Sequence, residues 1–183
     1  MSKIATVTDS TSYIPSELVT KHNITVAPQV LIWDDKTYRD GVDIQSAEFF
    51  ARLKTAKTMA TTSQVSVADM RVIFEGLIDK GFDVLGVFIS SKLSGTIQSA
   101  VQAKELMGSA GEKVTVFDSQ STAMALGFQV LSVARAAEGG ANLTDCLALA
   151  EKARDNTGVY FAVDTLEFLH RGGRIGGAAA FVG

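Results

Sequence analysis

Two short segments rich in hydroxyl side chains have the residue types that best suit binding chemistry. They are residues 61–64, with the sequence TTSQ, and residues 90–96, with the sequence SSKLSGT. Each stands just before a run with helical apolar spacing, where free N–H groups and the positive end of the helix dipole attract an anion. Because the chain offers these hydroxyls almost no catalytic base, they indicate a site that holds a carboxylate or a phosphate, and not one that breaks a bond.

The elements around the second segment place Ser94 and Gly95 at a strand-to-helix turn. Residues 84–89 form a continuous apolar run typical of a strand buried on both faces, and residues 97–107 have helical spacing. Open α/β sheets usually bind ligands at the carboxyl ends of their parallel strands. Glycine at position 95 carries no side chain and so lets a ligand oxygen approach the N–H groups that follow.

The first segment precedes a helix with a recognisable start. Ser66 and Asp69 resemble a capping box with aspartate in place of glutamate, so Thr62 and Ser63 are expected on the loop that leads into this helix. Serine and threonine before helices often act only as N-caps, and that interpretation stays open for either segment.

The rest of the chain alternates apolar, β-branched runs with helical patterns. Strands are expected at 4–7, 24–33, 84–89 and 114–117, and helices from Pro15 and over 47–53, 67–80, 97–107, 122–137 and 143–156. This alternation predicts an α/β fold with a parallel-rich sheet flanked by helices. A turn sequence at 34–36 adds a short antiparallel hairpin.

Several separated motifs resemble those of the DegV family of bacterial fatty-acid-binding proteins. They are TDSTSYIP from residue 8, TTSQVS from residue 61, SSKLSGTIQSA from residue 90, FDS at 117–119 and FAVDTLEFLHRGGRIGGAAAFVG from residue 161. The resemblance implies two α/β domains that bury a long-chain fatty acid, such as palmitate, in a tunnel. It further implies that the protein has no catalytic residue or cofactor and presents the carboxylate to a separate fatty acid kinase subunit, which makes acyl phosphate.

The same resemblance implies roles for individual residues. Thr62 and Ser94 match the positions whose hydroxyls hold the acyl carboxylate, and Gly95 lies beside them. Val65 stands where the family usually has proline, which predicts a less rigid loop. A family histidine near the carboxylate comes from a later part of the second domain and has no match in these residues.

Arg174 belongs to the segment RGGR at 171–174, which follows a short helical pattern at 165–170. The double glycine predicts a tight turn that directs an arginine outward. In the family this arginine is associated with the kinase partner, so Arg174 is expected to dock the kinase or meet the phosphoryl group. A plain solvated charge is the alternative interpretation.

The resemblance also implies where a second domain begins. Gly158 is expected to end the preceding helix, and residues 159–163 have the pattern of another buried strand. We therefore expect an N-terminal α/β domain at 1–157 and the start of a second, incomplete α/β domain at 158–183, since so short a stretch cannot bury a core of its own.

Composition and single residues exclude several other classes. A net charge of −3 does not indicate the basic surface that nucleic-acid binding requires. No apolar run reaches the length of about 18 residues that a membrane span needs, and the polar opening does not suit a signal peptide, so a cytoplasmic location is expected. The single Cys146 fits a helix core. His22, expected to be exposed near a helix end, and His170 lack metal-ligand spacing, so no metal is expected.

Three rival functions remain beside the fatty acid interpretation. A serine hydrolase using Ser94 lacks the G-x-S-x-G elbow, and only His170 follows as a base. A sugar-phosphate or other phosphometabolite domain would use the same helix terminus, although phosphate-binding glycine motifs are absent. A plain interaction module would use the hydroxyls only as caps. Asp9 and Asp118 each lie at a strand end. We interpret them as turn residues and not as acidic catalytic or metal-binding groups.

Overall fold

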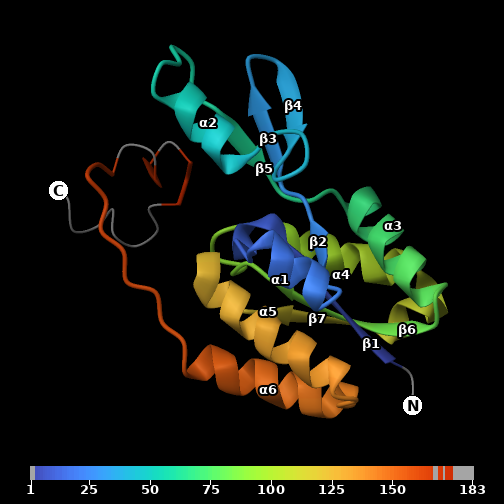
Figure 1. Ribbon diagram of the computed structural model, residues 1–183. Coiled ribbons are helices and arrows are strands. Elements are labelled where there is room, and N and C mark those ends of the chain that lie inside the picture. The colour runs from blue at the N-terminus through green and yellow to red at the C-terminus, as the bar shows by residue number, and fades with distance from the viewer. Residues whose placement is uncertain (1–2, 167–168, 171, 175–183) are drawn as a thin grey trace.

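A four-stranded parallel sheet lies at the centre of the molecule (Figure 1). This computed structural model describes residues 3–166, 169–170 and 172–174. The sheet has the strand order β2-β1-β6-β7, and every neighbouring pair is parallel. The strands are β1 (Lys3–Asp9), β2 (Thr25–Ala27), β6 (Phe82–Phe88) and β7 (Val114–Asp118). The predicted α/β fold with a parallel-rich sheet is confirmed.

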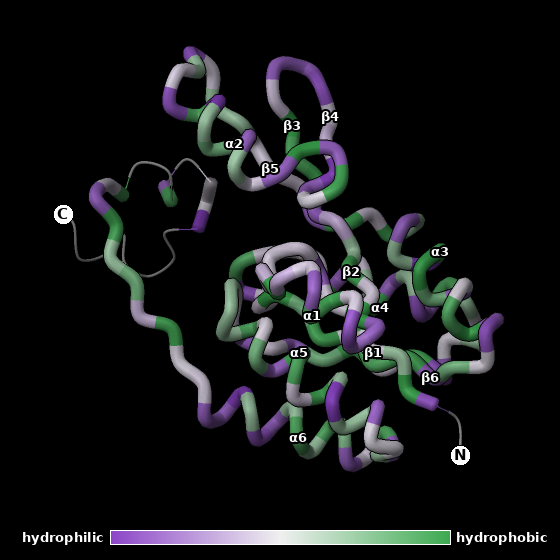
Figure 2. Tube along the Cα trace, in the orientation of Figure 1, coloured by the Kyte–Doolittle hydropathy of each residue, from purple (hydrophilic) through white to green (hydrophobic). Residues whose placement is uncertain are grey.

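Helices cover both faces of this sheet (Figure 1). Their bounds are α1 (Ser16–Lys21), α3 (Val67–Ile78), α4 (Thr96–Leu106), α5 (Ala123–Glu138) and α6 (Leu143–Asp155), with short 3-10 turns η1 (Ser10–Ser12) and η2 (Gly108–Lys113). Strand β6 is buried on both faces because its residues alternate between two cores. Leu85 and Val87 pack with α1, α5 and α6, whereas Val84 and Phe88 pack with α3 and α4. Figure 2 shows hydrophobic residues along the central strands and the helix faces that meet them.

A smaller lobe, residues 29–64, is inserted between β2 and α3. It contains β3 (Val30–Trp33), β4 (Lys36–Arg39), α2 (Ser46–Leu53) and β5 (Thr61–Ser63), and its strands form an antiparallel sheet in the order β4-β3-β5. Figure 1 shows this lobe beyond one end of the parallel sheet. The prediction of a single strand over 24–33 was therefore wrong. Pro28 interrupts it, because proline has no N–H to continue a ladder, and the chain passes from one sheet to the other there.

The predicted hairpin is confirmed, and it helps to hold the lobe together. Asp34 and Asp35 have φ angles of 50° and 58°, the left-handed pair that suits a two-residue hairpin turn. Leu31, Trp33 and Ile44 form the small core of the lobe. The guanidinium of Arg52 lies 4.2 Å from the centre of the Trp33 ring. The lobe thus has a core separate from the two cores of the parallel sheet.

The segment after α6 differs from its sequence prediction. Residues 159–163 form no strand, and Tyr160 and Phe161 are 102% and 73% exposed. A strand needs a neighbour for its N–H and C=O groups, and no strand in the described part of the chain pairs with this segment. The helix before it ends at Asp155 with Asn156 as its C-cap, earlier than Gly158. The start of a second domain at 158 stays a prediction.

Several single-residue predictions are also decided by the fold. Cys146 is fully buried, and Ser66 is the N-cap of α3, since its hydroxyl accepts from the N–H of Asp69 at 3.0 Å; the Asp69 carboxylate accepts from that hydroxyl and not from the N–H of Ser66. The prediction of an exposed His22 was wrong. It is 7% exposed, and its Nδ1 lies 2.8 Å from Oε2 of Glu138, because the end of α1 packs against the end of α5.

Within the described ranges no helix is long and apolar enough to cross a bilayer.

Candidate functional site

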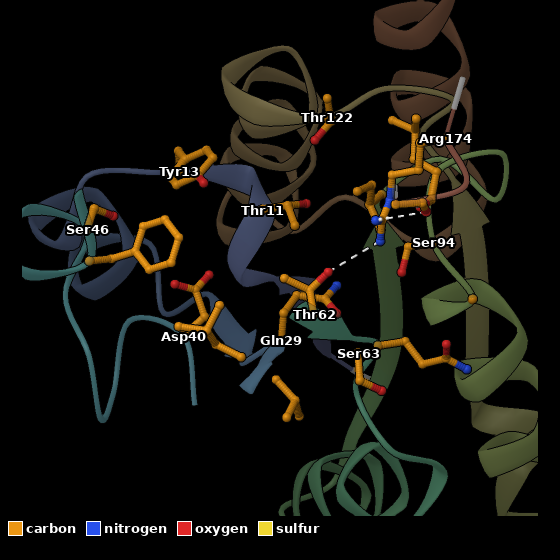
Figure 3. Close-up of a pocket in the computed structure, with 18 of the residues that line it drawn as sticks. Thr11, Tyr13, Gln29, Asp40, Ser46, Thr62, Ser63, Ser94, Thr122 and Arg174 are labelled. Atoms are coloured by element: carbon orange, nitrogen blue, oxygen red, sulfur yellow. Dashed lines mark hydrogen bonds between the residues drawn. The ribbon is translucent and has the colours of Figure 1, made fainter. Parts of the chain in front are cut away.

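A cavity of about 680 Å³ lies between the lobe, the loops that follow β1 and β6, and the turn at 172–174. This volume is within the range of about 300–1,000 Å³ that is usual for small-molecule sites. Figure 3 shows side chains from all of these segments directed toward one space. Thr62, Ser94, Gly95 and Arg174, the residues singled out from the sequence, all line it. The fold therefore brings together groups that lie up to 112 positions apart in the chain.

Thr62 reaches the cavity from a strand, and the prediction that it lies on a loop was wrong. Residues 61–63 form β5 and pair antiparallel with β3, with Thr62 opposite Leu31. A three-residue threonine and serine segment suits such a pairing, because β-branched threonine favours extended backbone. Thr62 is thus held by the antiparallel sheet of the lobe, whereas Ser94 is held by the parallel sheet.

Ser94 belongs to a chain of hydroxyl and amide hydrogen bonds at the start of α4. Its Oγ lies 2.9 Å from Oγ1 of Thr96 and accepts from the N–H of Thr96 at 3.3 Å. The buried amide of Gln29 donates to Oγ1 of Thr96 at 2.8 Å. Because Thr96 already accepts from Gln29, its own proton can be donated to Ser94, and the Ser94 proton then stays available for a ligand acceptor.

Gly95 is the N-cap of α4 and lies against the side chain of Gln64. A Cβ atom at position 95 would lie 2.6 Å from Oε1 of Gln64, closer than two such atoms can approach. The φ of Gly95 is −74°, a conformation open to other residues. A side chain at position 95 would therefore displace the flexible amide end of Gln64. Glycine leaves room for the Gln64 amide beside the helix N-terminus.

Arg174 follows a tight turn, as predicted, but its guanidinium does not point away from the protein. Gly173 has a φ of +68°, and the N–H groups of Gly173 and Arg174 bond to the carbonyls of His170 and Leu169, the pattern of a helix-ending Schellman turn. Nε of Arg174 donates to the Leu93 carbonyl at 3.1 Å, and Nη2 donates to Oγ1 of Thr62 at 3.3 Å (Figure 3). The side chain turns back because these two acceptors converge on the cavity, although Arg174 remains exposed.

Asp9 and Asp118 act as turn residues, as predicted. The buried carboxylate of Asp9 accepts from the N–H groups of Thr11 at 3.0 Å and Ile89 at 2.8 Å, and so joins the ends of β1 and β6. Asp118 accepts from the N–H of Gln120 at 2.8 Å. These contacts fix the loops that surround the cavity. Within the part of the chain that the structure describes, no group of three or more histidine, cysteine or acidic side chains is placed to hold a metal ion.

The lining of the cavity varies in polarity. Thr62, Ser94 and Arg174 form its polar end, and most of the apolar and aromatic lining residues, which form its apolar side, belong to the lobe and to the loop after β1. The apolar and aromatic lining residues are Tyr13, Val30, Leu31, Ile44, Phe49 and Phe50, together with Ile89 and Leu93 from the segment that carries Ser94. Partial burial, with a smaller contribution from the charge of Asp40, raises the pKa of Tyr13. Sequence reasoning missed Gln29 and these aromatic residues, because their partners lie on elements distant in the chain.

This fold and cavity define a class of protein: an α/β protein with a cavity that hydroxyls and an arginine line together with apolar and aromatic side chains. Comparisons with known proteins identify the family. The model of the DegV family, described as "Uncharacterised protein, DegV family", matches residues 3–183. The chain therefore belongs to the DegV family.

Individual relatives agree with this assignment. A DegV domain-containing protein of Listeria innocua is 38% identical over 182 residues, which is 99% of this chain and 64% of that protein. A fatty-acid-binding DegV family protein from Thermus thermophilus is 38% identical, with a TM-score of 0.88 over 98% of this chain and 63% of that one. DegV from Bacillus subtilis, a fatty acid binding protein, is 33% identical, with a TM-score of 0.90 over 100% of this chain and 64% of that one. The chain thus spans a little under two thirds of the length of these relatives.

Proposed function

We propose that this protein binds a long-chain fatty acid in the cavity and presents its carboxylate to a separate fatty acid kinase, without a catalytic residue of its own. The observation that carries the proposal is the convergence of Thr62, Ser94 and Arg174 at one end of a cavity whose other side is aromatic and aliphatic. Such a site matches a molecule with one anionic end and a long apolar remainder. The fatty-acid-binding relatives from Thermus thermophilus and Bacillus subtilis support the same choice of ligand.

The hydroxyl end supplies orientation. Hydrogen bonds to a charged acceptor contribute about 1.5–3 kcal/mol each, and most of this offsets the desolvation of the carboxylate. Ser94 keeps a free proton through Thr96, and Thr62 accepts from Arg174 and so keeps its own proton as well. Both hydroxyls can then donate to one carboxylate, with Arg174 beside them as the counter-charge.

The apolar side supplies affinity. An acyl chain of about fifteen methylenes, at about 0.8 kcal/mol each, gives on the order of 12 kcal/mol of gross driving force before the costs of association. A sugar phosphate has no comparable apolar part and would leave the aromatic wall of the cavity unfilled. The cavity therefore favours the fatty acid over the phosphometabolite that the helix terminus alone would also suit.

Arg174 is the residue that we assign to the kinase step. It lies at the exposed edge of the cavity, next to the hydroxyl of Thr62, where a partner reaching for the carboxylate would meet it. A guanidinium suits phosphoryl oxygens because it donates several hydrogen bonds in one plane. Arg174 is therefore assigned to contact the kinase or the phosphoryl group that the kinase transfers.

Native extraction of the bound lipid tests the proposed ligand. The intact protein is purified without detergent, and the small molecules that accompany it are released by solvent and identified by mass spectrometry. A fatty acid at close to one equivalent is the expected result. A phosphorylated metabolite at that stoichiometry, or no fatty acid retained even after incubation with palmitate, would overturn the proposal.

A further inference from the structure

The carboxylate of Asp40 lies on the apolar side of the cavity. Asp40 directly follows β4, and its backbone is fixed by a bridge to Ile44 and by a hydrogen bond from its N–H to the Gln29 carbonyl at 2.9 Å. Its side chain lines the cavity and is half-buried. It makes no hydrogen bond or ion pair with any other residue in the described part of the chain. The fold is therefore held by the backbone of Asp40 and does not require its charge.

The cavity thus carries opposite charges on its two sides. Figure 3 shows Asp40 on the side of Tyr13 and Ser46, and Arg174 and Ser94 on the opposite side. Lys92 adds a second positive side chain to the residues that follow β6 and line the cavity. Partial burial in this wall removes some of the hydration of the Asp40 carboxylate, and no side chain of the described residues compensates it with a hydrogen bond.

We propose that Asp40 is a specificity residue, which sets the direction of the bound ligand and excludes a second anionic group from the apolar side of the cavity. The inference rests on the proposed function, in which the ligand has one carboxylate and a long apolar chain. A ligand entering in the reverse direction would bring its carboxylate to Asp40, and like charges in a partly desolvated site repel strongly. A ligand charged at both ends would meet that repulsion in either direction.

The charge of Asp40 affects the ionisation of Tyr13, which lies on the same side of the cavity. The pKa of the Tyr13 phenol is raised, first by its partial burial and then by the nearby Asp40 carboxylate. The phenolate is an anion on the same wall that a reversed or doubly charged ligand would occupy. The physical effect that disfavours the phenolate also disfavours a ligand carboxylate there.

The test compares palmitate with hexadecanedioic acid, a diacid of the same chain length, by competition against a labelled fatty acid. Wild-type protein, Asp40→Asn and Asp35→Asn are compared in the same buffer. Asp35 is a matched control because it lies in the same lobe, at the β3–β4 turn, outside the cavity and in a left-handed conformation that asparagine also adopts. Each variant removes one negative charge and keeps the shape of the side chain.

We expect the wild type to prefer palmitate by at least about tenfold, and Asp40→Asn to reduce this ratio by at least about threefold, since the repulsion is removed and only the desolvation of the second carboxylate remains. Asp35→Asn should keep the wild-type ratio. A ratio that Asp40→Asn leaves unchanged, or that Asp35→Asn changes equally, would overturn the inference alone. Failure of the wild type to bind palmitate would instead overturn the proposed function, and this inference with it.

Discussion

The guanidinium of Arg174 donates to the hydroxyl of Thr62, across 3.3 Å of space and 112 positions of sequence. The same side chain donates to the carbonyl of Leu93, the residue before Ser94. Arg174 thus connects the antiparallel sheet of the lobe to the loop after β6, and it does so at the polar end of the cavity. A substitution of Arg174 should therefore alter the positions of both hydroxyls that we assign to ligand binding, those of Thr62 and Ser94.

Replacing Arg174 by alanine should reduce acyl phosphate formation in a reconstituted pair with a fatty acid kinase by at least about tenfold, because a charged hydrogen-bond donor to the phosphoryl group contributes about 1.5–3 kcal/mol. Retention of a labelled fatty acid should fall much less. Arg71→Ala is the control, since Arg71 pairs with Glu75 on the surface of α3. Unchanged kinase activity in the Arg174 variant would contradict the role that we assign to it.

Thr62→Ala and Ser94→Ala should impair presentation of the carboxylate more than retention of the lipid, because the hydroxyls orient the head group while the apolar wall holds the chain. Both are measured on the same protein samples, retention with a labelled fatty acid and presentation with the kinase. Thr61→Ala and Ser91→Ala are matched controls, since neither residue lines the cavity. Equal losses in the two assays would count against this division of roles.

Gln29→Met should weaken fatty acid binding by roughly fivefold at most, which corresponds to about 1 kcal/mol, the usual contribution of one hydrogen bond, and like Ser94→Ala it should impair presentation to the kinase more. Methionine has a similar shape but cannot donate to Thr96, so the orientation of the Thr96 and Ser94 protons is no longer fixed. Affinity is measured by fluorescence competition at a temperature where the variant is fully folded. An affinity and a presentation to the kinase both equal to those of the wild type would show that the Gln29 amide does not set the donor at Ser94.

Asp9→Ala should lower the free energy of unfolding by about 3 kcal/mol, since it leaves buried N–H groups at the ends of β1 and β6 without their acceptor. Urea unfolding followed by circular dichroism gives this value. Asp9→Asn keeps one acceptor oxygen and should cost less. A loss below about 1 kcal/mol for the alanine variant would be inconsistent with Asp9 acting as a clamp between the two strands.

Asp43 should titrate near pH 2, because hydrogen bonds from the side chain and the N–H of Arg39 hold the pKa of its carboxyl at about 2 and below the ordinary value of 3.8. Since the folded pKa is lowered, the stabilisation is present above the ordinary value and is lost as the pH falls toward 2. Carbon NMR of the side-chain carboxyl measures the midpoint. Arg39→Ala should raise it toward 3.8, and a midpoint already near 3.8 in the wild type would refute the pairing.

Much of the fold follows from local patterns in the sequence. The alternation of buried strands and amphipathic helices fixes the parallel sheet, because each pattern depends on the spacing of neighbouring residues. The N-cap at Ser66 and the hairpin turn at Asp34 are equally local and are confirmed. Pro28 was the available signal that the predicted strand over 24–33 should be divided, since proline interrupts a ladder wherever it occurs.

The sequence by itself determined which side chains carry hydroxyls and a positive charge, and that Ser94 and Gly95 lie where a parallel strand meets a helix. Only the tertiary structure decided that Thr62 comes from an edge strand of a second sheet, that Arg174 turns back to reach it, and that Asp40 shares their cavity. The physical reason is the range of the forces involved. Helix starts and turns depend on neighbours a few residues away, whereas a cavity depends on how segments distant in the sequence pack together. Such packing produces no periodic pattern in the sequence.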